Sequence, residues 1–311
     1  MAQYFTERLQ KVFHMIFTSY NQKMAQEGLR QLELIVNNQQ NPSQLKDRAL
    51  RNDKTSRLES DIDTKEDALK IANDPEAREL GDAYALLARV YAGPRFTWEE
   101  SNFPEDNMRT YQCLHDSIRR CSPIGTLQAL RIKGSITPTV EKDMQISFDK
   151  AFRIVYDYAN QGDAYCQYVI GNVFFWRDDN RISSAETMLT PPPMSWTKRI
   201  QRSLTANSVQ DCIAALQGTV PDETLQENAS NLAKEWFNKA LDNGLAMFQG
   251  NLRNIYIDEA DFSNARRVAK TAAELGNPAM MLYTGLDCHE NGKFEDAFTW
   301  FTKGAALGQS E

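Results

Sequence analysis

The sequence predicts an all-α protein, a stack of about five helical hairpins with a helical cap at the N-terminus and two inserts. Two observations carry this prediction. Three segments near the C-terminus repeat with a period of 32 residues, and the apolar residues within them are spaced as on one face of an α-helix. Because one hairpin of this size cannot bury both of its faces, neighbouring hairpins must stack on it to complete a continuous core.

The repeat has four columns when NLAKEWFNKALDNG, FSNARRVAKTAAELG and FEDAFTWFTKGAALG are placed one above another. One column holds alanine and another holds glycine, namely Ala233, Ala265 and Ala297, then Gly244, Gly276 and Gly308. Apolar residues fill the other two, namely Trp236, Val268 and Trp300, then Phe237, Ala269 and Phe301. The small residues let a partner helix approach closely, so the pattern predicts helices that pack tightly in pairs.

Turn and cap residues predict where these helices begin and end. A glycine tolerates positive φ and stops a helix, an asparagine or serine caps the next one, and proline suits the first helical position. The residues with these roles are Gly276, Asn277 and Pro278, the turn Asn291 and Gly292, and the cap Ser122 with Pro123.

The register continues upstream in a weaker form. Ala151 and Gly162 have the same separation as Ala233 and Gly244. The tetrapeptide GDAY occurs at residues 81–84 and 162–165, and we expect each copy to open the second helix of a hairpin. Residues 107–134, between the two copies, predict one more helix pair.

These segments resemble the Sel-one-like repeats, relatives of the tetratricopeptide repeats. The pattern is that of AKEWFNKALDNG, ARRVAKTAAELGNPAMMLYTG and AFTWFTKGAALG, with the similar ANQGDAYCQYVIG and ARELGDAYALLARVYAG upstream. The chain departs from it in the two inserts and after Tyr256, where IDEADFSNA replaces a glycine-bounded loop. The resemblance implies a right-handed α-solenoid and an adaptor role, as in signalling, secretion quality control or bacterium-host contact.

The predicted organisation has four parts. Residues 1–65 form the N-terminal helical cap and a polar linker, residues 66–176 hold degenerate repeats with an insert at 94–106, residues 177–229 are a second insert, and residues 230–311 hold the regular repeats. Helically spaced apolar residues at positions 5–35 predict amphipathic helices that cover the first repeat.

The inserts have two interpretations, which the sequence leaves open. Inserts in repeat arrays map to loops on one face, which is often the binding face. Alternatively, their aromatic side chains anchor surface loops to the protein itself. The candidate contact residues are Phe96, Trp98 and Phe103 in the first insert and Trp196 in the second.

Composition and motifs predict no catalysis, cofactor or metal. The 35 Lys and Arg against 42 Asp and Glu give a net charge of −7, which disfavours nucleic acid as a partner. The five cysteines lack paired spacing, the three histidines form no chelating pair, and the common phosphate-binding, zincin and hydrolase motifs are absent. No window predicts a membrane span, and charges at residues 7–11 interrupt any secretory leader, so we expect a cytoplasmic location, with a secreted effector as the alternative.

The sequence therefore predicts a scaffold or adaptor that binds a peptide or helix of a partner protein in a concave groove. Polar residues five, nine or ten positions after the repeat glycines are the candidate groove residues: Gln167, Asn172, Gln249, Arg253 and Asn254. The alternative is a helical portion of a larger enzyme or effector whose catalytic part lies in residues 177–229 or beyond residue 311. The apolar face near Gly308 predicts a fragment of a longer array or an end that docks another subunit.

Overall fold

The computed structural model describes residues 3–40, 65–92, 106–129, 144–175, 229–246 and 249–307. Within these ranges the protein is all-helical, with thirteen α-helices, one π-helix and no strand. The all-α prediction is thus confirmed. The predicted polar linker and almost all of the two predicted inserts, at 94–106 and 177–229, lie outside the described residues.

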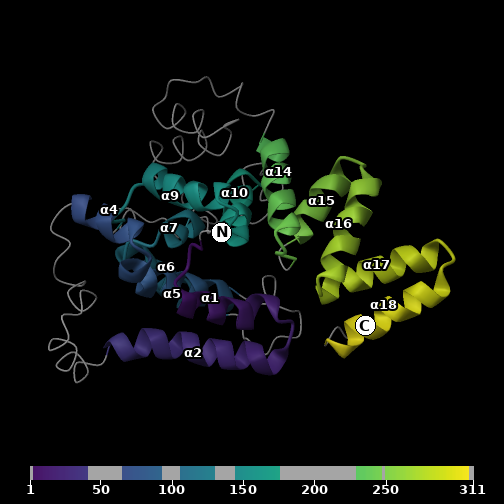
Figure 1. Ribbon diagram of the computed structural model, residues 1–311, viewed down its shortest axis with the longest axis horizontal. Coiled ribbons are helices and arrows are strands. Elements are labelled where there is room, and N and C mark those ends of the chain that lie inside the picture. The colour runs from purple at the N-terminus through teal and green to yellow at the C-terminus, as the bar shows by residue number, and fades with distance from the viewer. Residues whose placement is uncertain are drawn as a thin grey trace.

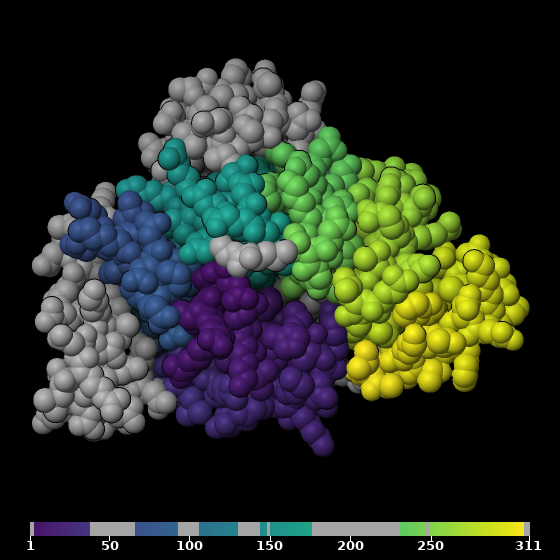
Figure 2. All heavy atoms as spheres, in the orientation of Figure 1, coloured from purple at the N-terminus to yellow at the C-terminus, as the bar shows by residue number. Residues whose placement is uncertain are grey.

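The N-terminal helices lie along the lower edge of the molecule in the view of Figure 1. They are α1 (Glu7–Phe13), the π-helix η1 (His14–Thr18) and α2 (Gln22–Gln40). In Figure 2 they occupy the lower centre of the visible face, with the helices of residues 65–119 on one side and the C-terminal hairpin on the other. A Cβ added at Gly276 would lie 3.1 Å from the Tyr20 ring, so this segment reaches a distant hairpin as well as the first repeat, which the sequence predicts it to cover.

The next group consists of α4 (Lys65–Asn73), α5 (Pro75–Tyr91), α6 (Asn107–Arg119) and α7 (Pro123–Ala129). Asp74 caps α5 by accepting a hydrogen bond from the Glu76 amide at 3.0 Å, with Pro75 in the first helical position. Ser122 caps α7 as predicted, since its hydroxyl accepts from the Gly125 amide at 3.0 Å.

The first GDAY copy does not open a helix, and this corrects the predicted repeat register. Gly81 lies in the middle of α5, whereas Gly162 stands at the turn before the next helix. A Cβ at Gly81 would come within 2.7 Å of the Arg120 carbonyl oxygen. Gly81 therefore allows α5 to pack closely against the link from α6 to α7. The same tetrapeptide has different structural roles in its two copies.

The second half of the chain runs as successive helices, each packed on the next in chain order. They are α9 (Phe148–Asn160), α10 (Ala164–Phe175), α14 (Ala229–Asp242), α15 (Gly250–Asp258), α16 (Phe262–Glu274), α17 (Pro278–Glu290) and α18 (Phe294–Ala306). Figure 1 shows this succession from teal through green to yellow.

The predicted hairpin turns are confirmed at the repeat glycines. Gly162, Gly244 and Gly276 have φ of 96°, 88° and 101°, and each ends the first helix of a hairpin in the left-handed conformation. The Asn277 side chain then accepts from the Met280 amide at 3.1 Å and caps α17. The turn between α15 and α16 has no glycine. There Ala260 takes the left-handed conformation, with φ of 56°.

Glycine and phenylalanine fit together where consecutive hairpins meet. Added Cβ atoms at Gly171 and Gly285 would lie 2.6 Å and 2.5 Å from ring carbons of Phe237 and Phe301, respectively. Arg253 occupies the same repeat position as these two glycines, 20 residues after the column alanine. In that copy the phenylalanine column holds the small Ala269, so a large side chain and a small one have exchanged places.

Candidate protein-interaction site

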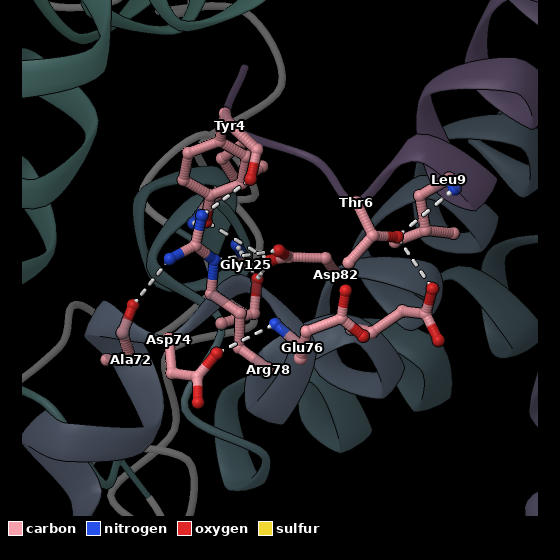
Figure 3. A network of polar contacts seen from close by, with 12 residues as sticks. Tyr4, Thr6, Leu9, Ala72, Asp74, Glu76, Arg78, Asp82 and Gly125 are labelled. Carbon is pink, nitrogen blue, oxygen red and sulfur yellow. Dashed lines mark hydrogen bonds and ion pairs between the residues drawn. The ribbon is translucent and has the colours of Figure 1, made fainter. Parts of the chain in front are cut away.

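The chain holds its own N-terminal segment in a site built from several helices, which we name the Tyr4 site (Figure 3). Tyr4 and the residues that follow it precede α1 and come between α5, α7 and α10. The side chains that form the site come from α5, α9, the start of α10 and the cap of α7: Arg78, Glu79, Asp82, Ser122, Tyr158, Asp163 and Tyr165.

Side chains bind both main-chain groups of Tyr4. The Tyr4 amide donates to Oδ2 of Asp163 at 3.0 Å, and its carbonyl oxygen accepts from Nη2 of Arg78 at 2.6 Å. The Tyr4 phenol donates to Oδ1 of Asp82 at 3.1 Å, and the Ile124 amide donates to the phenol oxygen at 3.4 Å. The aspartates of the two GDAY copies therefore meet at one tyrosine.

Arg78 organises this cluster from a fully buried position. Its Nε lies 3.1 Å from Oδ2 of Asp82, its Nη1 donates to the Ala72 carbonyl at 2.8 Å, and its guanidinium carbon stands 4.0 Å from the centre of the Tyr4 ring. Ser122 adds a 2.6 Å hydrogen bond to Asp82. A buried charge is tolerated only when it is paired and hydrogen-bonded, and this pair meets that condition.

Burial also shifts the acid-base properties of the cluster. It raises the pKa of Asp82, although the Arg78 guanidinium and the hydrogen bonds from Ser122 and Tyr4 oppose that rise. Burial likewise raises the pKa of the Tyr4 phenol well above its ordinary value, and the Asp82 carboxylate adds to the effect. The phenol therefore stays protonated and donates its hydrogen bond over the whole physiological pH range.

The residues after Tyr4 extend the contact. The Phe5 ring centre lies 5.6 Å from that of Tyr165, and Phe13 on α1 lies 4.7 Å from the same ring. The Thr6 hydroxyl donates to Glu79 at 2.6 Å and accepts from the Leu9 amide at 3.3 Å, which starts α1. The segment therefore enters the site as a bent, non-helical stretch and leaves it as a helix.

Two of the predicted groove residues lie inside the protein, which corrects their assignment as accessible contacts. Gln167 donates to the Ala159 carbonyl at 2.9 Å, and Gln249 donates to the Leu245 carbonyl at 2.6 Å. Gln249 has no exposed surface. These amides satisfy backbone carbonyls near the turns, so they stabilise the hairpins.

The other three predicted groove residues lie in a row over the second helices of the hairpins, which we name the Arg253 row. Asn251 on α15 donates to Asn172 on α10 at 3.2 Å. The Arg253 guanidinium stacks on the ring of Tyr283 on α17, with 3.8 Å from the guanidinium carbon to the ring centre. Asn254 is exposed beside it. The row thus links three hairpins.

The last helix presents aromatic side chains to solvent. Phe294 and Phe298, one turn apart on α18, are 63% and 72% exposed. In the two earlier repeats the position equivalent to Phe298 holds a basic residue. Lys234 forms an ion pair with Glu259, and Arg266 forms one with Asp287, each with 2.6 Å between nitrogen and oxygen. That position therefore faces the following helix in both earlier repeats. The predicted insert contacts Phe96, Trp98, Phe103 and Trp196 lie outside the described residues.

Three of the four described cysteines are buried thiols, and Cys288 is partly exposed. Burial raises the pKa of Cys113 and of Cys121 to about 12, and it also raises the pKa of Cys166. Thiols with such pKa values stay protonated and react slowly near neutral pH. Among the described residues no group of three or more His, Cys, Asp or Glu side chains is placed to hold a metal ion.

Comparisons with known proteins add no relative. No family model, no curated protein and no solved structure matches the chain. In the part of the chain that the structure describes, no helix has the length and apolar character needed to cross a membrane. The resemblance to Sel-like repeats therefore rests on the residue pattern alone.

The sequence contained one signal for the Tyr4 site, the repeated GDAY. It marks Asp82 and Asp163, which both bind Tyr4. Nothing in the local pattern identifies Tyr4 or Arg78 as their partners, because these contacts join residues that are 74 to 159 positions apart along the chain.

Proposed function

We propose that the chain is a protein-interaction scaffold, a right-handed α-solenoid of Sel-like repeats that binds a peptide or a helix of a partner protein. One observation carries the proposal: side chains from several parts of the fold bind both the main chain and the side chains of a non-helical segment at the Tyr4 site. Binding of extended or helical segments by successive hairpins is what a stacked repeat surface does well.

The Arg253 row is the proposed contact surface for the partner. It offers a guanidinium stacked on an aromatic ring, with amides on both sides, and Tyr283 and Leu286 on α17 remain partly exposed beside it. Arginine and tyrosine are enriched among the residues that dominate binding energy, and amides supply hydrogen bonds at the rim. Partners of this surface are polypeptides with acidic or aromatic side chains.

The test is affinity capture from a lysate of the source organism, with mass spectrometry of the eluate. The baits are the wild type, an Arg253→Ala/Asn254→Ala double variant and, as the control, Lys70→Ala at an exposed position of α4. We expect one stoichiometric protein on the wild type and the control, and its loss on the double variant at an unchanged melting temperature.

Equal retention on all three baits would contradict the assignment of the row. An eluate without any partner would instead favour the alternative, in which these helices belong to a larger enzyme or effector. Nucleic acid in the eluate, measured by absorbance, would contradict a purely protein partner.

A further inference from the structure

We propose that the Tyr4 site is a peptide-binding site that the chain fills with its own N-terminal segment, and that a partner protein binds by inserting a tyrosine–aromatic–threonine segment in its place. This inference rests on the proposed scaffold function and names the ligand class for one of its sites. The inference is based on the position of Tyr4, which is hydrogen-bonded to Arg78, Asp82 and Asp163.

The first observation is how the main chain of the segment is bound. Buried main-chain amides and carbonyls in a fold mostly pair with other main-chain groups. At Tyr4 the amide instead meets the Asp163 carboxylate, just before α10, and the carbonyl meets the Arg78 guanidinium of α5. These charged side chains bind main-chain groups that every peptide carries, so the site is suited to a segment supplied in trans.

The second observation is the selectivity of the site for a phenol. The Tyr4 hydroxyl lies between the Asp82 carboxylate and the Ile124 amide, and the ring lies under the Arg78 guanidinium. The Tyr158 ring stands edge-on to it, with 5.3 Å between the ring centres. A phenylalanine in this place would remove one hydrogen bond from a buried carboxylate, so the site favours tyrosine.

The following positions complete the ligand pattern. An aromatic ring at the position of Phe5 meets Tyr165, and a hydroxyl at the position of Thr6 meets Glu79. An amphipathic helix follows, since Phe13 at the end of α1 packs on the same Tyr165. The matching partner segment is therefore tyrosine, an aromatic residue and threonine, followed by an amphipathic helix.

The experiment uses the full chain with a specific protease site placed within residues 41–64. The chain is purified folded and then cut, and the cut is verified by mass. The probe is a fluorescent peptide of residues 1–20, and its binding is followed by anisotropy and size exclusion. The tether in the uncut chain makes its own segment an intramolecular competitor, which the cut removes.

We expect the peptide to enter the cut chain stoichiometrically and to enter the uncut chain at least tenfold more weakly. A Tyr4→Phe peptide should bind about tenfold more weakly than the wild-type peptide. A Lys11→Ala peptide, changed at an exposed position of α1, should bind as the wild type does. A cut chain that stays folded but admits no peptide would overturn the proposal, and so would equal binding of the Tyr4→Phe peptide.

If the cut chain unfolds, hydrogen exchange on the uncut chain tests the proposal instead. We expect the Tyr4 amide to exchange through a local opening while the amides of α10 and α16 stay protected. Exchange of Tyr4 only together with those helices would show that the segment is an inseparable part of the core, and would overturn the proposal. Neither result changes partner capture by the Arg253 row, so failure of this inference is distinguishable from failure of the scaffold function.

Discussion

The regions before and after residue 176 are both made of helices but are stabilised in different ways. The first is irregular, and buried polar side chains join segments far apart in the chain, with Arg78 and Asp82 at the centre. The second repeats every 32 residues and packs through small residues, while its ion pairs, such as Arg266 with Asp287, lie at the surface. The first region is closed by its own N-terminus, whereas the second leaves Phe294 and Phe298 open.

This difference separates two ways of specifying a helical array. Repetition of small and large side chains sets the spacing of neighbouring hairpins, which is a local property. Buried charges instead require one particular set of partners, because an unpaired buried charge is strongly unfavourable. We infer that buried charge pairs specify one arrangement of the first region, whereas regular packing specifies the spacing of the hairpins in the second.

The largest expected effect is the loss of the buried cation. Arg78→Met leaves Asp82 buried without its counter-charge, and we expect a loss of about 3–5 kcal/mol in the free energy of unfolding, measured by urea denaturation. The matched variant Arg266→Met removes a surface ion pair and should cost less than about 1 kcal/mol. Equal losses from the two variants would contradict the contrast between the regions.

Alkaline pH should also destabilise the first region. Cys113 and Cys121 have a folded-state pKa of about 12, against 9 for an ordinary thiol. Above pH 9 the unfolded thiols release protons that the folded ones keep, so the unfolded state binds fewer protons and stability falls as pH rises. The expected slope is about 1 kcal/mol per pH unit for each thiol between pH 9 and 12.

The control for this slope is the Cys113→Ala/Cys121→Ala variant, unfolded by urea at a series of pH values. A change in the stability of this variant near neutral pH does not affect the test, because only the slope of stability against pH above pH 9 reports on the two thiols. A slope identical to that of the wild type would show that other groups cause the alkaline loss.

Packing in the second region is tested at Gly285. A Cβ at this position would stand 2.5 Å from a ring carbon of Phe301, so Gly285→Ala should cost about 1–3 kcal/mol. Adding Phe301→Ala removes the clash, so in thermal unfolding the double variant should lose less stability than the sum of the losses of the two single variants. Simple additivity of the two single variants would mean that the ring moves aside freely.

Much of the second region was predictable because its determinants are local. The column alanines are buried, the described repeat glycines Gly244 and Gly276 end helices, and Asn277 caps α17, all as expected from spacing and turn chemistry. The role of Gly81 was predicted incorrectly, since its close neighbour at Arg120 is about 40 positions away along the chain. The repeat spacing aligns positions along the sequence but contains no information on tertiary contacts, so it could not show which glycine ends a helix.

The candidate site was less predictable for two physical reasons. A polar side chain on a helix can bind a nearby backbone carbonyl, as Gln249 does, and then it is buried although its residue type favours solvent. Recognition of Tyr4 depends on contacts between segments that only the folded chain brings together. Asn172, Arg253 and Asn254 remain as candidates because their spacing placed them on second helices that share one surface.

The smallest expected effect concerns the one link where the repeat lacks its glycine. Ala260 stands 32 residues before Gly292, and both are left-handed, with φ of 56° and 74°. A left-handed conformation costs an L-residue about 1–2 kcal/mol, while glycine loses about 0.5–1 kcal/mol more backbone entropy on folding. Ala260→Gly should therefore stabilise the protein by about 0.5–1 kcal/mol and Gly292→Ala should destabilise it by a similar amount, as measured by urea denaturation. A destabilising Ala260→Gly would mean that the alanine methyl group makes contacts worth more than the strain, and that this link is specialised rather than a degenerate copy of the next.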